Sequence, residues 1–218
     1  MRPNPPPFII LVACCASSLF HSGSVNATPL ASSLPDLAQT FVDMPSDRIP
    51  LLEEAWRKDL VALYRDGKEA KLQNRLKGFS HLKTLTPDYI FLQVTAGSTL
   101  ELQLLSLADT AAVLCMITTV SAPVLDSRIE FFTPDWTPLS LTSFFTLPNI
   151  SSFLLSDELP PNLECLDMPL IHYQLNPDAL TLIASLTTPF YLDDNQRKIV
   201  SPYIVPSKTY IWDGCRFK

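Results

Sequence analysis

Glycine and histidine are scarce in this chain of 218 residues, which holds five glycines and three histidines. Phosphate-cradling loops and dinucleotide-binding turns need clustered glycines, because the backbone must approach the ligand closely. Every glycine here is isolated, so the sequence excludes a P-loop or a Rossmann nucleotide site. No HExxH or HxH spacing occurs either, and of the five cysteines the three beyond residue 27 are too widely spaced to form a zinc site. The sequence therefore predicts no cofactor and no metal.

A serine hydrolase site also has little support. The chain lacks a GxSxG elbow, and the only bases available beyond residue 27 are His81 and His172. The simpler interpretation is that both are ordinary surface or packing histidines. Asp193, Asp194 and Asn195 lack the alternating ligand spacing of a calcium loop, and a helix-capping role is favoured for them.

Positive charge is also limited, since the formal net charge is −6. A net negative charge opposes binding to nucleic acid or to an anionic membrane. The sequence shows no basic cluster that would offset it, so we expect no nucleic-acid partner. Beyond the N-terminus, no apolar run reaches the ~20 residues of a membrane-spanning helix.

The first 27 residues have the pattern of a removable export signal. Arg2 provides a positive start, an uncharged apolar stretch runs from Phe8 to Phe20, and Val25-Asn26-Ala27 is a small-x-small cleavage pattern. Removing 27 of 218 residues leaves 191 and makes the net charge −7, because the signal holds one basic and no acidic residue. We expect an exported protein of the periplasm or cell surface, with a flexible lead-in over 28–40 and a single domain over 41–218.

A competing interpretation of the same segment is lipidation. Leu11-Val12-Ala13-Cys14 resembles a lipobox, in which Cys14 would carry a lipid anchor. The apolar run before Cys14 is shorter than the ~7 residues usual for such signals. Cleavage after Ala27 is therefore favoured, with the anchor as the alternative.

Three cysteines remain after the signal. Cys115 lies within an apolar run and is interpreted as a core residue, whereas Cys165 and Cys215 lie in less apolar segments. An oxidising compartment would allow a Cys165–Cys215 disulfide. Sequence alone does not place the two Cα atoms, so the bridge and two free thiols stay open as alternatives.

The periodicity of apolar residues predicts an α+β fold. Ile49, Leu52, Trp56, Leu60 and Leu63 recur at steps of three and four, which predicts an amphipathic helix over 47–64 with Ser46 as its N-cap. The charged residues between them are expected to face solvent, namely Glu53, Glu54, Arg57, Lys58 and Asp59. From about 85 to 132 the period changes to two, which predicts a meander of antiparallel strands. Further strands are expected at 168–175 and 180–187. The prediction is a single domain, with a largely antiparallel sheet and this one main helix packed on a face.

Aromatic residues are densest after that meander. Phe132, Trp136, Phe144 and Phe145 fall within a short, proline-containing segment. Exposed rings there would offer a ligand-binding patch for a sugar or a protein. The alternative is that the rings cover one end of the sheet as part of the core, which is the usual way a loop anchors itself.

Several motifs resemble a known family. They include Leu85-Thr-Pro-Asp-Tyr89, Thr187-Thr-Pro-Phe-Tyr-Leu192 and the stretch from Ala122 to Trp136 with its Pro-Asp-Trp ending. The resemblance is to domain of unknown function 3256, exported proteins of Bacteroides-like bacteria. Ser121 and Leu125 stand where members of that family often have cysteines. The resemblance implies an exported bacterial protein and no known activity, cofactor or catalytic residue.

These observations favour a non-catalytic binding or structural module of the envelope, whose partner would be an envelope glycan or protein. The alternative is an envelope hydrolase that acts on glycan or peptide through acidic residues. Two carboxyl groups facing each other across a cleft at about 5 to 10 Å would favour the enzyme. A homo-oligomeric scaffold is the third hypothesis.

Overall fold

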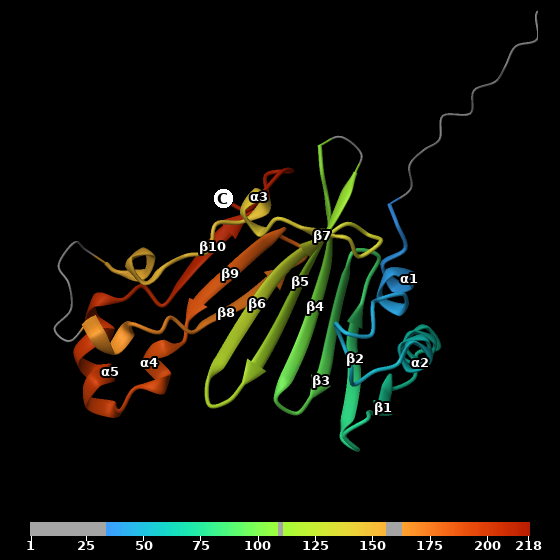
Figure 1. The fold of residues 1–218 in the computed structure, drawn as a ribbon, viewed down its shortest axis with the longest axis horizontal. Coiled ribbons are helices and arrows are strands. Elements are labelled where there is room, and N and C mark those ends of the chain that lie inside the picture. The colour runs from blue at the N-terminus through green and yellow to red at the C-terminus, as the bar shows by residue number, and fades with distance from the viewer. Residues whose placement is uncertain (1–33, 109–110, 156–162) are drawn as a thin grey trace, which may run out of the picture. The chain divides into compact units, whose positions relative to one another are not determined.

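The structure is a computed structural model that describes residues 34–108, 111–155 and 163–218 (Figure 1). The predicted signal, its cleavage after Ala27 and the alternative anchor at Cys14 lie outside the described residues. In the part of the chain that the structure describes, no helix has the length and apolar character needed to cross a bilayer.

A seven-stranded antiparallel sheet forms the larger part of the fold. Each strand pairs with the next one in sequence, so the sheet is a meander. Its strands are β1 (Lys71–Gln73), β2 (Phe79–Leu85), β3 (Tyr89–Thr95), β4 (Ser98–Ser106), β5 (Ala112–Ser121), β6 (Leu125–Phe132) and β7 (Pro138–Leu139). The predicted meander over 85–132 is confirmed, and three further strands extend it at its two ends.

A second, three-stranded antiparallel sheet follows, in the order β10-β9-β8. It contains β8 (Ile171–Asn176), β9 (Thr181–Leu186) and β10 (Ser207–Ile211). The single sheet predicted from the sequence is thus two sheets. β4 and β5 are buried on both faces, as expected for strands that lie between two layers. The short helices of this half are α3 (Leu141–Phe144), η1 (Ile150–Phe153), η2 (Leu163–Leu166), α4 (Thr188–Tyr191), α5 (Asp194–Val200) and η3 (Ser201–Tyr203).

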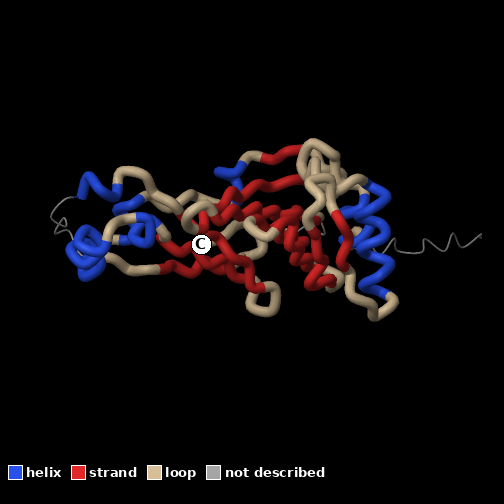
Figure 2. Tube along the Cα trace, turned by 90° about the horizontal axis from the view of Figure 1, so that it is seen from below, coloured by secondary structure: helices blue, strands red, loops and turns tan. Residues whose placement is uncertain are grey.

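The large sheet separates two hydrophobic cores. On one face, Leu82, Ile90 and Leu102 pack with α1 (Leu37–Val42) and α2 (Glu54–Arg65). On the other face, a second core joins β4–β6 to the inner side of β8 and β9. Figures 1 and 2 show α1 and α2 beside β1–β3, and α4 and α5 at the far end of the second sheet.

The helix that the sequence predicts over 47–64 is shorter in the structure. α2 begins after Glu53, which makes no side-chain capping bond, whereas residues 46–52 form turns. Ile49 and Leu52 are buried from those turns, so their spacing imitated a helical stripe. Ser46 is therefore not the N-cap. Gly67, with φ +70°, follows the helix end as expected of a residue in the left-handed region.

The expected lead-in differs in its last residues. Leu37–Thr40 belong to α1, and Leu37 and Phe41 are fully buried against α2 and the sheet. Asp36 caps this helix by accepting a hydrogen bond from the Ala38 N–H at 3.0 Å. A helix of six residues is too short to be stable alone, so its burial against the rest of the fold stabilises α1. The folded domain therefore starts before residue 41.

Side chains of the large sheet hold the edge strand of the small one. The N–H groups of Ile171, Tyr173 and Leu175 on β8 donate to Asp126 Oδ1, Ser127 Oγ and Glu101 Oε2, each at 3.1 Å. An edge strand otherwise exposes its alternate N–H groups. These three bonds satisfy that edge and fix how the two sheets cross.

Glu101 is the buried member of this set. It is 4 % exposed and also accepts a hydrogen bond from the Tyr89 hydroxyl at 2.8 Å. Burial raises the pKa of the Glu101 carboxyl, and the bonds from Tyr89 and Leu175 only partly oppose that rise. Gln103, on the same face, makes no side-chain hydrogen bond within the described residues. Ionisation of the Glu101 carboxyl therefore lowers stability.

We expect Glu101→Gln to change the pH dependence of folding. A carboxyl whose folded pKa is raised binds its proton more tightly in the native state, so stability is lost as pH rises above the usual value of 4.5. Urea unfolding should show the wild type losing stability relative to the variant between mildly acidic and neutral buffer. Asp59→Asn, at an exposed carboxylate of α2, is the control. If the difference in the free energy of unfolding between the wild type and Glu101→Gln does not change with pH, the expectation is wrong.

Candidate functional site

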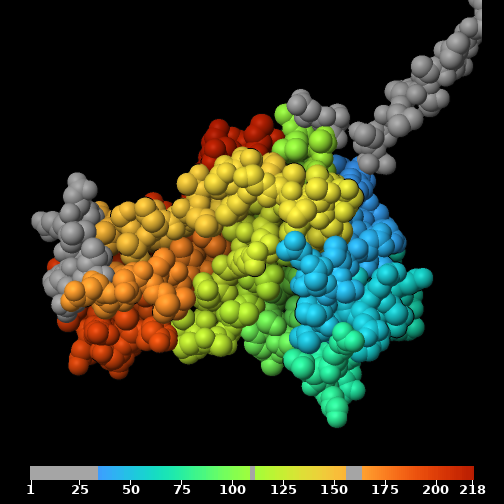
Figure 3. Space-filling model, in the orientation of Figure 1, coloured from blue at the N-terminus to red at the C-terminus, as the bar shows by residue number. Residues whose placement is uncertain are grey.

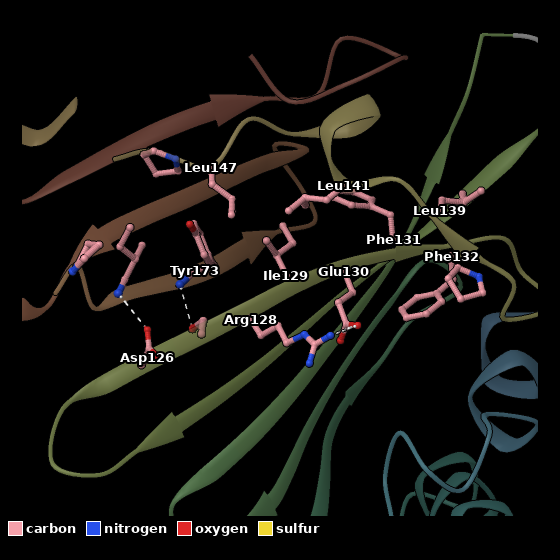
Figure 4. Close-up of a pocket in the computed structure, with 15 residues that line it drawn as sticks. Asp126, Arg128, Ile129, Glu130, Phe131, Phe132, Leu139, Leu141, Leu147 and Tyr173 are labelled. Carbon is pink, nitrogen blue, oxygen red and sulfur yellow. Dashed lines mark hydrogen bonds and ion pairs between the residues drawn. The ribbon is translucent and has the colours of Figure 1, made fainter. Parts of the chain in front are cut away.

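The best-defined concavity is a groove of about 570 Å³ along β6. Its floor is the strand itself, and its walls come from β7, from the segment after β7, and from β8. Figure 4 shows Ile129, Leu141, Leu147 and Tyr173 converging on this space, whereas Arg128 and Glu130 point away from it. The groove is in the size range of ligand sites and mainly apolar.

The floor of the groove is an open strand edge. β7 pairs only with Phe131 and Phe132, so within the described residues no strand forms backbone pairs with the rest of β6 on that side, although β8 lies close by and bonds to the Asp126 and Ser127 side chains. The Thr133 N–H donates to the Thr137 carbonyl at 2.9 Å, so odd-numbered residues turn their backbone groups toward the β7 side. Because the β5–β6 register is unbroken, the N–H and C=O groups of Ser127 and Ile129 face the groove. The Leu125 carbonyl, one step earlier, accepts from the Thr187 hydroxyl at 2.6 Å, which agrees with this assignment.

The pairing between β6 and β7 tolerates a proline and stops where the chain leaves the sheet. Pro138 occupies the position opposite Phe132, where a strand residue needs no N–H toward its partner. Beyond Leu139 the chain turns into α3. From the sequence, the proline-containing segment 133–148 is interpreted through its aromatic residues, and the groove is not predicted.

The charged side chains of β6 are already engaged. Glu130 Oε1 lies 3.0 Å from Arg48 Nη1 and 2.8 Å from Arg128 Nη2. Asp126 accepts the Ile171 N–H described above. Four residues along a strand separate the two acidic Cα atoms by about 13 Å. This spacing and these bonds do not match the facing carboxyl pair of a glycosidase, at about 5 to 10 Å.

The four aromatic residues proposed as one patch are divided between the two cores. Phe132 and Trp136 pack together on the helix side, with ring centroids 5.3 Å apart. Phe144 and Phe145 belong to the core on the other side. Phe132, Trp136 and Phe145 are buried and Phe144 is half-buried, so the rings act as core residues. Phe132 lies on β6, whereas Trp136, Phe144 and Phe145 come from the turn after β6, from α3 and from the residue after α3.

The cysteines are free thiols in the structure. Cys115 is buried in the core of the large sheet, Cys165 is half-buried and Cys215 is exposed. The Cys165–Cys215 disulfide considered from the sequence is not formed. Burial raises the pKa of the Cys115 thiol, which keeps it protonated and unreactive.

The two histidines that the structure describes are far from a catalytic arrangement. His81 Nδ1 lies 4.0 Å from Glu69 Oε1, and burial lowers the pKa of His81, with help from Lys83 and Lys71. Burial also lowers the pKa of His172, whose cross-strand neighbour is Ser185. No carboxylate bonds to His172 among the residues that the structure describes. Within those residues there is also no cluster of three metal-ligating side chains. Asp193 caps α5 as the sequence suggests, by accepting from the Asn195 and Gln196 N–H groups.

Comparison with known proteins shows the family and the fold. A search of curated proteins gives no match. A solved structure, of a domain of an uncharacterized protein from Porphyromonas gingivalis W83, is similar, with a TM-score of 0.75 and 26% identity. The similarity covers 84% of this chain and 98% of that one. The family described as "Protein of unknown function (DUF3256)" matches residues 31–217, and the chain therefore belongs to the DUF3256 family.

Proposed function

We propose that this protein is an exported, non-catalytic binding module of the periplasm or cell surface, and that its β6 groove holds an extended peptide segment of a partner. The observation that carries the proposal is the open edge of β6 on the floor of the groove. An open edge offers alternating N–H and C=O groups, and another extended backbone complements them.

The groove suits a short segment. Ser127 and Ile129 offer two outward-facing backbone positions, and one added strand would bond to both. Ile129, Leu141 and Leu147 would contact alternate side chains of the peptide, since strand side chains point to opposite faces. Small or apolar side chains are therefore expected at those positions of the ligand.

The rival hydrolase has less support at this site. General acid–base chemistry needs a carboxyl group placed to exchange protons with the substrate. Glu130 is held by two arginines, and Asp126 bonds to β8, so the groove offers no free pair of carboxyl groups. The peptide-binding hypothesis uses groups that the groove does offer.

Affinity capture from an envelope extract would test the proposal. The bait is the chain beginning at Thr28, and the blocked variant is Leu147→Trp, at a residue that is 51% exposed on the groove wall. We expect the blocked variant to retain less than about a tenth of the partner, because a new indole occupies the space of the ligand. Phe190→Trp, at a site 67% exposed and outside the groove, is the matched control.

The recovered partner decides the ligand class. A synthetic segment of the partner should bind, and methylating its alternate backbone nitrogens should abolish binding, because those N–H groups make the strand bonds. Recovery of a glycan whose binding Leu147→Trp removes would overturn the peptide assignment. A wild-type dimer on sizing chromatography that Leu147→Trp dissociates would identify a second copy as the occupant.

A further inference from the structure

The hairpin between β1 and β2 displays two apolar side chains at its tip. Leu76 is 70% exposed and Phe79 is 56% exposed. Figure 3 shows this tip projecting at the lower edge of the view, below the helices. Exposed apolar side chains on a projecting turn have no role in the cores described above.

Hydrogen bonds of Asn74 fix the conformation of this turn. Asn74 is buried, and its Nδ2 donates to the Val94 carbonyl at 3.1 Å and to Ser80 Oγ at 3.2 Å. Its Oδ1 accepts the Leu76 N–H at 3.1 Å, and its backbone N–H donates to the Gly78 carbonyl at 2.9 Å. Leu76 is therefore presented by an anchored turn.

Positive charge surrounds the tip. Between Gly67 and Pro87 the chain carries five of its 16 basic residues and one of its 22 acidic residues. Lys71, His81 and Lys83 line one concave side of β1–β3, and Lys71 Nζ lies 4.9 Å from the centre of the Phe79 ring. Glu69 and Glu53 offset part of this charge, at 4.0 Å from Lys71 and 3.4 Å from Arg75. The net charge of the whole chain conceals this local excess.

We propose that this basic hairpin docks on the surface of an anionic lipid bilayer. Leu76 and Phe79 enter the boundary between headgroups and acyl chains, while Lys71, Lys77 and Lys83 contact lipid phosphates. Lysine stems pack along apolar surface while their ammonium groups stay in the polar layer, which suits residues that flank an inserted ring. The acidic remainder of the molecule is repelled, so only the tip makes contact.

Vesicle co-sedimentation tests this docking. The chain beginning at Thr28 retains every contact described here, and it is mixed with vesicles of equal parts phosphatidylglycerol and phosphatidylcholine, or of phosphatidylcholine alone. We expect binding to the anionic vesicles only, and weaker binding as salt is raised, because the charges involved are exposed.

Variants separate the two contributions. Leu76→Ser with Phe79→Ser should weaken binding about thirtyfold by removing the apolar insertion. Lys77→Gln with Lys83→Gln should weaken it about twenty-five-fold, roughly fivefold for each lysine. The matched controls are Phe190→Ser with Met168→Ser, at exposed apolar residues elsewhere, and Lys198→Gln with Lys208→Gln. Both control pairs should bind as the wild type does.

Two outcomes would overturn the inference. One is equal binding by the Leu76/Phe79 variant and the wild type. The other is a wild type that does not bind vesicles but binds heparin as strongly as the Leu76/Phe79 variant does. That result would indicate that the ligand of the hairpin is a soluble polyanion. Circular dichroism of each variant distinguishes lost docking from lost folding, since all four tip positions are exposed.

Discussion

Replacing Arg57 with methionine should lower the free energy of unfolding by about 3 kcal/mol. Arg57 is 1% exposed, and its guanidinium donates to the carbonyl groups of Val42, Met44 and Leu52. The variant leaves three buried acceptors without donors, and the removed cost of burying a charge offsets only part of that loss. Burial lowers the pKa of Arg57, with Glu54 and Asp43 opposing. Urea unfolding followed by circular dichroism measures the change.

A second substitution and a control define the cause. Arg57→Lys keeps a positive charge but replaces the planar fork with one ammonium, so it should still cost about 2 kcal/mol. Lys58→Met removes a charge from the exposed neighbour and should change stability by less than about 0.5 kcal/mol. Arg, Lys and Met have similar helix propensities, so α2 itself is a fair host for the comparison. An Arg57→Met protein as stable as Lys58→Met would contradict a connecting role for the guanidinium.

Trp136→Ala should lower the free energy of unfolding by about 4 kcal/mol. The indole is 8% exposed, packs on Phe132, and donates its Nε1–H to the Thr40 carbonyl at 2.9 Å. It thereby joins the turn after β6 to α1. The substitution leaves a cavity and an unpaired helix carbonyl, and thermal or urea unfolding measures their sum. Tyr191→Ala, at a ring that is 53% exposed, is the control and should have a small effect.

The backbone at Trp136 adds a sharper expectation. Its φ of +66° lies in the left-handed region, which costs about 1 kcal/mol for a residue with a Cβ and little for glycine. Trp136→Gly should therefore be at least as stable as Trp136→Ala, the reverse of the order at most positions. A glycine variant that is clearly less stable than the alanine variant would show that the strain is relieved in some other way.

The sequence predicted the meander for physical reasons that are local. In β3 and β4 every second residue is apolar and packs on the helix side of the sheet, and such alternation is visible in a single strand. Asp193 was identified as a cap because side-chain capping depends only on neighbouring residues. The segments that follow a short-range rule were therefore predicted well.

Arg57 shows where such reasoning fails. A charged residue between charged neighbours on a helix is usually exposed. Nothing in the local pattern indicates that the Arg57 guanidinium donates to three backbone carbonyl groups that precede the helix. Phe132 and Phe145 give the same lesson, because closeness in sequence placed them in one patch while the sheet placed them on opposite sides of itself. The groove itself depends on the lack, among the described residues, of a strand paired with the middle of β6, which no residue of β6 encodes.

By itself the sequence determined the elements that arise from periodicity and capping: an antiparallel β-rich body with a helical N-terminal part and no clustered glycines for a nucleotide site. Only the tertiary structure decided that the strands form two sheets, that β6 has an open edge and that Leu76 and Phe79 project among lysines. Those features depend on which distant segments meet. The packing of segments far apart in the chain determines which of them meet, whereas the residue pattern within a single segment does not.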